Sequence, residues 1–333
     1  MMDDVPQEPQ VSRDTQAVLL LCSRFAPREQ IEPLDTREYS RVEDLLQQRS
    51  LRLGDLLDDV DLDWAASGLD AARIAQLLDR AMGLGLATER WANGGLWVIS
   101  RSDDDYPTRL LQHLGRSAPP LLWGVGERSL PASGGIAIVG SREIDDAAAK
   151  WAEDVAAAFA REAITVISGG ARGTDQIATA AALNEGGRVI GVLPEGLGKP
   201  SVVGRYREAV VDGRLLLLSS VYPDAGFTVG NAMGRNKVIY GIAEAAVIVR
   251  ADANSGGTWA GAEAELKRED AIPVFVRAEG DVAEGNRALI AIGARAFPAQ
   301  PWEDMRALLT SPAREAAHGK DRLPIGQIKL FGA

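Results

Sequence analysis

Two glycine-rich segments place arginine beside small polar residues, a combination suited to holding phosphate. Gly140, Ser141 and Arg142 follow one apolar run, and residues 168–175 (SGGARGTD) follow the next. Glycine lets the backbone approach an anion, a hydroxyl can donate a hydrogen bond, and arginine can contact phosphate through two N–H groups. The second segment leads into a predicted helix, whose N-terminal N–H groups and dipole favour negative charge. Its candidate residues are Ser168, Gly169, Gly170, Arg172, Gly173 and Asp175.

A purely structural interpretation of these segments stays open. The glycines can simply permit tight strand-to-helix turns, and Asp175 can cap its own helix. Short glycine motifs occur often without any ligand. Two such segments in consecutive units nevertheless favour a phosphate site.

Two later segments supply further candidates. Arg235, Asn236 and Lys237 are expected to begin a helix, where cations oppose the helix dipole, so a bound anion is favoured. Another helix is expected to open within residues 254–259, where Trp259 is more typical of core packing than of base stacking. The ligand-binding candidates of that opening are Ser255, Gly256, Gly257 and Thr258.

No catalytic arrangement emerges from the residue types. The G-x-x-x-x-G-K-[ST] pattern of nucleotide-hydrolysing P-loops is absent. The two histidines, His113 and His318, lie in a connector and in the tail, and both are expected at the surface. We therefore expect no catalytic residues, no cofactor and no metal site.

The elements that position these segments can be predicted from residue 136 onward, where short β-rich runs alternate with alanine-rich helical stretches. Because the runs are apolar throughout, they predict parallel strands covered by helices on both faces. The fold class is α/β: a doubly wound, mostly parallel Rossmann-like sheet with a small N-terminal helical domain. In such a sheet, ligands bind where loops leave the carboxyl ends of the strands. Strands are expected at 136–139, 164–167, 188–193, 215–218, 246–249 and 272–276, with helices at 146–161 and 175–184.

Hydrophobic spacing at i, i+3 and i+4 over residues 14–82 indicates the helical domain. Extended pieces are expected over 91–100, around a turn at 93–95. The predicted organisation is a disordered start at 1–13, a helical domain similar to SAM or helix-hairpin-helix modules at 14–88, a connector with short strands at 89–130, a Rossmann-like domain at 131–298 and a tail at 299–333.

The composition is that of an ordinary globular protein, with 46% apolar and 25% charged residues among 333. A net charge of −11 argues against indiscriminate adhesion to nucleic acid, but it does not exclude a local basic groove. The single cysteine, Cys22, excludes an internal disulfide and fits a reducing compartment. The apolar run at 17–21 is too short to span a membrane and follows an acidic start, so we expect no signal peptide, no membrane anchor and a cytoplasmic location.

The order of these motifs resembles the DNA-processing protein A (DprA, or Smf) family over roughly residues 91–297. The residues that carry the resemblance are Asp105-Tyr106-Pro107, Leu110, Pro119-Pro120-Leu121-Leu122-Trp123, Ile136 to Arg142, Ser168-Gly169, Ala171-Arg172-Gly173, Asp175, Arg235-Asn236, Gly285-Asn286, Leu289-Ile290 and Gly293-Ala294.

The resemblance implies a protein that binds single-stranded DNA through its Rossmann-like domain, protects it and loads a RecA-type recombinase onto it, often as a homodimer. It assigns Arg142, Arg172 and Arg235, with their neighbouring glycines, to the phosphates of the strand. It implies neither nucleotide hydrolysis nor bond cleavage. The chain departs from the family pattern at Gly170, Thr179 and Ser220. It also lacks the usual tyrosine-proline segment at 199–207, where Lys199 and Arg205 are the candidate basic residues.

The last residues suggest a separate partner. Gln327, Leu330 and Phe331 resemble the Q-x-x-L-F peptide with which bacterial proteins dock on the DNA sliding clamp. A tail with two large apolar residues is suited to pocket binding. The alternative is that this end folds back onto its own domain.

Two other functions on the same fold stay open. One is a phosphoribohydrolase-like enzyme, which requires a glutamate three residues after the threonine of its glycine signature. Here Gly261 occupies that position and Glu263 falls two residues later, on a different helix face. The other is a sensor of a free nucleotide-like ligand in the same crevice, since both ligands present phosphate and base.

Overall fold

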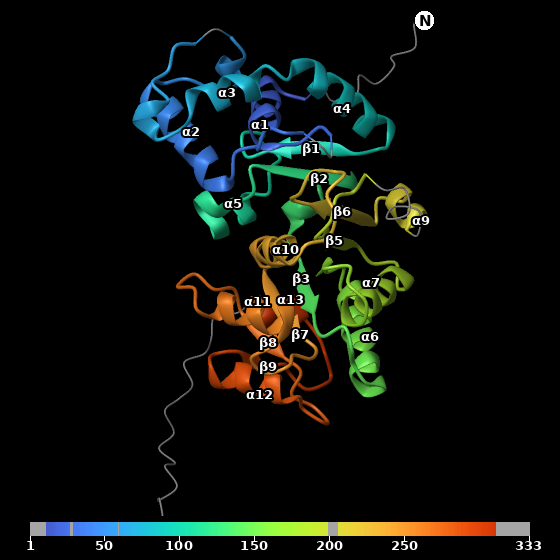
Figure 1. Ribbon diagram of the computed structural model, residues 1–333. Coiled ribbons are helices and arrows are strands. Elements are labelled where there is room, and N and C mark those ends of the chain that lie inside the picture. The colour runs from blue at the N-terminus through green and yellow to red at the C-terminus, as the bar shows by residue number, and fades with distance from the viewer. Residues whose placement is uncertain (1–10, 27–28, 59, 199–205, 311–333) are drawn as a thin grey trace, which may run out of the picture.

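The computed structural model describes residues 11–26, 29–58, 60–198 and 206–310. Figure 1 shows a layer of helices from the N-terminal third of the chain at one end, and below it a long sheet flanked by helices. In the described residues no helix is both long and apolar enough to cross a membrane.

The sheet contains nine described strands in the order β1-β2-β6-β5-β4-β3-β7-β8-β9. The pairs β1–β2 and β2–β6 are antiparallel, and every other pair is parallel. The expected doubly wound, mostly parallel fold is therefore confirmed, and all six predicted strands are present within two residues of their expected ends. The strands are β1 (Trp97–Ser100), β2 (Leu121–Gly126), β3 (Ile136–Val139), β4 (Val166–Ser168), β5 (Val189–Leu193), β6 (Leu215–Ser219), β7 (Ala245–Ile248), β8 (Val274–Val276) and β9 (Arg295–Ala296).

Helices cover both faces of the sheet (Figure 1). Alternate residues of one strand point to opposite faces, so Ile136 and Ile138 join the core on one face while Ala137 joins the core on the other. The α-helices are α1 (Arg13–Cys22), α2 (Thr36–Gln48), α3 (Ala71–Leu78), α4 (Ala81–Asn93), α5 (Thr108–Leu114), α6 (Asp146–Arg161), α7 (Thr174–Asn184), α9 (Arg207–Val211), α10 (Val229–Ile242), α11 (Gly256–Leu266), α12 (Glu284–Ala291) and α13 (Met305–Thr310). The 3-10 turns are η1 (Leu53–Leu57), η2 (Ala65–Ser67), η3 (Gly115–Ser117) and η4 (Leu130–Ser133).

The N-terminal helices pack directly on the antiparallel end of the sheet. Trp91 at the end of α4 meets Trp123 of β2 edge to face, with 6.2 Å between ring centroids. The expectation of extended pieces over 91–100 is wrong in its first half, because α4 continues to Asn93 and only β1 is a strand. The glycine pair after Asn93 ends this helix instead of turning a hairpin.

The chain reverses its direction across the sheet between β3 and β7. It runs from β3 through β4 and β5 to β6, then returns through α10 to β7 on the other side of β3. The loops after β3 and β7 therefore diverge and leave a crevice at the carboxyl ends of these two strands, the usual ligand position in open α/β sheets.

Candidate nucleic-acid interface

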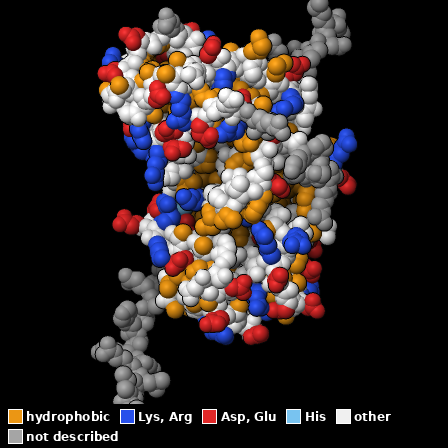
Figure 2. Space-filling model, viewed as in Figure 1, with side chains coloured by type: hydrophobic (Ala, Val, Ile, Leu, Met, Phe, Trp, Pro, Cys, Tyr) orange, Lys and Arg blue, Asp and Glu red, His pale blue; other side chains and the backbone are white. Residues whose placement is uncertain are grey.

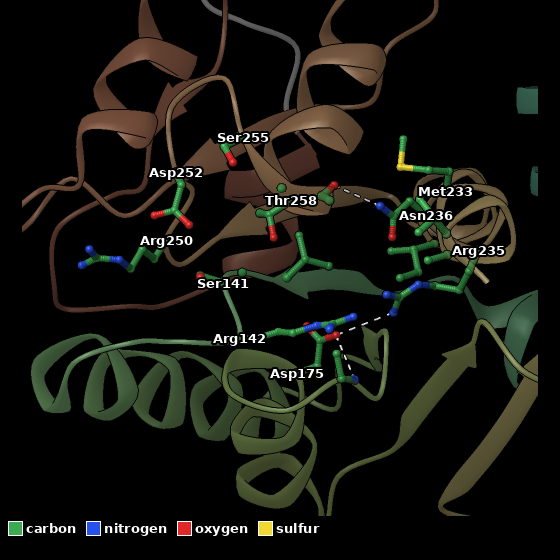
Figure 3. A pocket seen from close by; sticks show the side chains of 18 of the residues that line it. Ser141, Arg142, Asp175, Met233, Arg235, Asn236, Arg250, Asp252, Ser255 and Thr258 are labelled. Atoms are coloured by element: carbon green, nitrogen blue, oxygen red, sulfur yellow. Dashed lines mark hydrogen bonds and ion pairs between the residues drawn. The ribbon is translucent and has the colours of Figure 1, made fainter. Parts of the chain in front are cut away.

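A pocket of about 760 Å³ occupies this crevice. Four separate chain segments line it: the loop after β3, the turn before α7, helix α10 with the residues that precede it, and the loop from β7 into α11 (Figure 3). The predicted site residues that line it are Gly140, Ser141, Arg142, Asp175, Arg235, Asn236, Ser255, Gly256, Gly257 and Thr258.

Backbone contacts fix the loop after β3 between its neighbours. The Ser141 N–H donates to the Arg250 carbonyl at 2.9 Å, which ties the loop to the segment after β7. On the other side, the Thr174 hydroxyl donates to the Ser141 carbonyl at 3.1 Å. A Cβ on Gly140 would overlap the Thr174 side chain, so glycine at this position lets the two loops meet.

Arg235 lies at the bottom of the pocket, in the interior of α10 and not at its beginning as expected. The helix starts six residues earlier because Thr228 caps it, with its hydroxyl accepting the Asn231 N–H at 3.0 Å. The prediction that Arg235 opposes the dipole at the N-terminus of its helix is therefore wrong. The case for an anion rests instead on burial, because Arg235 is only 8% exposed.

The partner of Arg235 is Asp175, with 3.6 Å between Nη1 and Oδ2. This is too long for a hydrogen bond. Among the described residues, Nε and Nη1 of Arg235 and Oδ1 of Asp175 have no hydrogen-bond partner. Burial lowers the pKa of Arg235 and raises the pKa of Asp175, and in each case the opposite charge of the other only partly offsets the effect. Within the described part of the chain, the pair therefore leaves buried N–H groups of a charged side chain without an acceptor at the wall of the pocket.

Helix α11 begins at the opposite wall without a side-chain cap. Gly256 has a φ of +77°, and the first residues of the helix line the pocket. The Asn236 side chain donates to the Gly257 carbonyl at 3.0 Å and so holds this helix start against α10. Helix starts with uncapped N–H groups, such as that of α11, are a general feature of anion sites.

The pocket also has an apolar wall that was not predicted. Phe227, Val229 and Met233 line it and are 51%, 74% and 37% exposed. The Arg142 guanidinium lies over the Phe227 ring, 5.8 Å from its centroid. Figure 2 shows hydrophobic side chains at the surface across the middle of the molecule, with Lys and Arg side chains beside them. Phe227 directly before the capping Thr228, with Val229 and Met233 four residues apart in the first turns of the helix, is the sequence signal that could have revealed this wall.

Several predicted residues do not line the pocket. Ser168 is buried, and its hydroxyl donates to the Ile138 carbonyl at 2.8 Å. Gly169 and Gly173 leave room for the Arg235 side chain and the Arg142 backbone respectively. Arg172, Gly170 and Lys237 lie away from the lining set, with Arg172 and Lys237 exposed. Lys199, Arg205, Gln327, Leu330, Phe331 and His318 lie outside the described residues.

The residues considered for catalysis or base stacking are packed in the core or paired with neighbouring side chains. His113 is buried, contrary to the expected surface position, and its Nε2 is 3.0 Å from Oε2 of Glu265. Trp259 is 7% exposed and belongs to the core. Glu263 forms an ion pair with Lys267 at 2.9 Å and does not line the pocket. In the described residues no cluster of potential metal ligands occurs.

Known proteins resemble the chain in both sequence and fold. Over 166 residues it is 31% identical to Protein Smf of Synechocystis, and the matched segment covers 47% of this chain and 40% of that protein. The X-ray structure of DNA processing protein A from Streptococcus pneumoniae superposes with a TM-score of 0.67 at 24% identity, covering 86% of this chain and 95% of the other. The structure of DNA processing protein A from Helicobacter pylori, which describes the single-stranded DNA binding mode of that protein, superposes with a TM-score of 0.50 at 23% identity, covering 60% of this chain and 90% of the other.

The matched part of Protein Smf is less than half its length, and the two structural matches establish a shared fold. The model of one protein family, DNA recombination-mediator protein A, matches residues 97–309, which is more than half of the chain and includes all four segments that line the pocket. The chain therefore belongs to the DNA recombination-mediator protein A family.

Proposed function

We propose that this protein binds single-stranded DNA at the carboxyl edge of its sheet, with backbone phosphates in the pocket between β3 and β7. The observation that carries the proposal is the buried Arg235 guanidinium, which lacks hydrogen-bond partners for Nε and Nη1 among the described residues. Buried N–H groups without hydrogen bonds are costly, and a phosphate oxygen is the ligand that a guanidinium binds best.

The apolar wall of the pocket favours a nucleic acid as the ligand over a simple anion. Phosphate needs only N–H donors, but exposed Phe227, Val229 and Met233 offer an apolar surface that bases can cover. Membership of the family and the single-stranded DNA named for the Helicobacter pylori relative support the same ligand.

On the same basis we propose that the protein protects the bound strand and delivers it to a RecA-type recombinase, acting as a homodimer in the cytoplasm. The basic residues Lys199 and Arg205 would extend the strand-binding surface. Docking of the tail residues Gln327, Leu330 and Phe331 on a sliding clamp stays a separate hypothesis.

The glutamate on which the enzyme alternative depends does not line the pocket. A phosphoribohydrolase needs a carboxylate facing the sugar, whereas Glu263 is paired with Lys267 outside the lining set. Gly261 lies against Asn236 and Tyr240, where a longer side chain would collide. A sensor of a free nucleotide stays the second candidate, because the same donors would hold a mononucleotide.

The two candidates can be separated by fluorescence anisotropy with oligothymidylates of 5, 10, 20 and 40 nucleotides at two salt concentrations, with duplex and mononucleotide competitors. A strand-binding protein gains affinity with length and loses it with salt. Tight mononucleotide binding without any gain from length would reject the proposal in favour of the sensor.

Substitution of Arg142 by Ala is expected to weaken binding roughly 10-fold or more on every sequence tested, because a charge-assisted contact to phosphate is lost and phosphates carry no base information. Arg161→Ala is the matched control. Arg161 is exposed in the last turn of α6. Since α6 runs back toward the amino edge of the sheet, Arg161 lies far from the pocket. A loss confined to particular sequences would contradict the assignment of Arg142.

A further inference from the structure

The carboxyl edge of the sheet carries two more arginines beyond the main pocket. Arg250 lies two residues after the end of β7, and Arg277 directly follows β8. Because β7 and β8 are neighbouring parallel strands, both side chains leave the same edge of the sheet. Arg250 also lines the main pocket, and Figure 3 shows its guanidinium directed away from Arg142 and Arg235.

Arg277 is buried without a matching acceptor. It is 6% exposed, and its Nε has no hydrogen-bond partner in the described part of the chain. Its position is fixed by the backbone, since its N–H donates to the Ile248 carbonyl at 2.9 Å and its own carbonyl accepts the Asn286 side-chain N–H at 3.0 Å. Gly280, with a φ of +67°, lies directly beside its guanidinium.

The carboxylate that pairs with Arg250 is Asp145. Asp145, the N-cap residue of α6, is 3.1 Å from Nη1 of Arg250, and its other oxygen accepts the Ala148 N–H at 2.8 Å. The pKa of Asp145 is lowered first by the Ala148 hydrogen bond and further by the charges of Arg277 and Arg250. Asp145 is thus committed to Arg250 and to its own helix, whereas Arg277 keeps an Nε without a partner among the described residues.

We propose that Arg250 and Arg277 form a second phosphate subsite, which takes the next phosphate group of a strand whose first phosphates occupy the pocket between β3 and β7. A guanidinium buried with an unpaired N–H is stabilised by an anion, and Arg250 connects the two positions along the edge. The subsite rests on the proposed function and adds a direction to it. The strand continues past β7 toward β8.

The test compares Arg277→Gln with Arg287→Gln, an exposed arginine on α12 that lines neither position. Anisotropy is measured with the dinucleotide-length and 20-nucleotide oligothymidylates over a range of salt concentrations. The 20-mer is expected to bind Arg277→Gln several-fold more weakly, with the slope of log K against log salt reduced by about 0.7, the value for one phosphate contact on a single strand. Binding of the short ligand, which reaches only the main pocket, is expected to match the wild type.

An unchanged salt slope in a folded Arg277→Gln variant overturns the subsite and assigns Arg277 to the neutralisation of the acidic turn alone. Equal losses for short and long ligands overturn it as well, because they indicate a distorted main pocket. A thermal melt of both variants establishes the fold, and Arg250→Gln provides a second measurement of the slope if Arg277→Gln does not fold. Failure of the wild type to gain affinity with oligonucleotide length is a different result, which rejects the proposed function itself.

Discussion

Gly169 lies beneath the guanidinium of Arg235, and the two leave no space for a side chain between them. A Cβ at this position would overlap the Arg235 guanidinium and come within 2.7 Å of Oδ2 of Asp175. The glycine after β4 is not among the residues that line the pocket, and it leaves the space that the Arg235–Asp175 pair occupies.

We predict that Gly169→Ala displaces Arg235, weakens oligonucleotide binding at least 10-fold and destabilises the fold by about 1–3 kcal/mol through overpacking. Gly234→Ala is the control, because Gly234 lies in α10 with nothing within 4 Å of an added Cβ. That change should leave binding intact and stabilise the helix by about 0.5–1 kcal/mol. Anisotropy and urea denaturation of both variants provide the comparison. Binding by Gly169→Ala at wild-type affinity would show that the position of Arg235 is unimportant.

Residue types alone predict that Arg142, Asp175 and Arg235 belong to one pocket: Arg142 and Asp175 lie in glycine segments that follow apolar runs, and Arg235 stands beside Gly234 and Asn236 before the next run. They could not supply the burial of Arg235, which depends on where α10 starts. Thr228 three residues before Asn231 is a capping signal in the sequence that would have moved this start. Arg250 could have been predicted from the sequence as well, since it follows an apolar run in the same way as Arg142.

The ends of β7 and β8 are joined by a single buried side chain. Asn286 at the start of α12 is 1% exposed. Its Oδ1 accepts the Ala251 N–H at 2.9 Å, and its Nδ2 donates to the Val249 and Arg277 carbonyls at 3.1 and 3.0 Å. These three bonds hold the loops that carry Arg250 and Arg277, so the residue stabilises the edge without reaching a ligand.

We expect Asn286→Ala to lower the free energy of unfolding by about 2–4 kcal/mol, because three buried backbone groups lose their partner. Asn184→Ala at the exposed end of α7 should change it by less than about 0.5 kcal/mol. Chemical denaturation measures both. A loss below 1 kcal/mol for Asn286→Ala would indicate that water or neighbouring groups replace the three bonds.

Elements that follow one another along the chain could be predicted, because apolar runs and alanine-rich helices alternate from β3 to β8. The position of β1 and β2 in the sheet could not be predicted. The pairing of β2 with β6 joins Trp123 to Ser219, nearly a hundred residues away, and no local pattern encodes a contact of that range. The turn signal at 93–95 predicts an extended Trp91, but this residue packs against Phe25 and Trp123 from within a helix.

One of the two hydrophobic clusters formed by the described residues extends from the N-terminal helices through the sheet to α13. It includes Leu19 of α1, Trp91 of α4, Trp123 of β2, Phe159 of α6 and Leu309 of α13. The domain boundaries at 14–88, 89–130 and 131–298 stay a prediction. This cluster, however, includes residues from all three of these ranges. We therefore expect the N-terminal helices and the sheet to unfold together.

Urea unfolding of the full chain should give a single transition by circular dichroism and by tryptophan fluorescence. Trp91→Ala should shift that whole transition by about 3–5 kcal/mol, because it empties the contact between the helices and the sheet. Met82→Ala, on the same helix but 83% exposed, should shift it by less than about 0.5 kcal/mol. Two separate transitions, with only one sensitive to Trp91→Ala, would establish independent domains.

The antiparallel addition of β1 and β2 also determines how two copies of this protein can meet. At that end of the sheet the outermost strand, β1, has only four residues and contacts α1. At the other end, β9 contributes two residues. Long bare edges invite backbone pairing between chains, and among the described strands neither end offers one. A homodimer of this protein would therefore be held by interlocking side chains and not by a sheet that runs from one copy into the next.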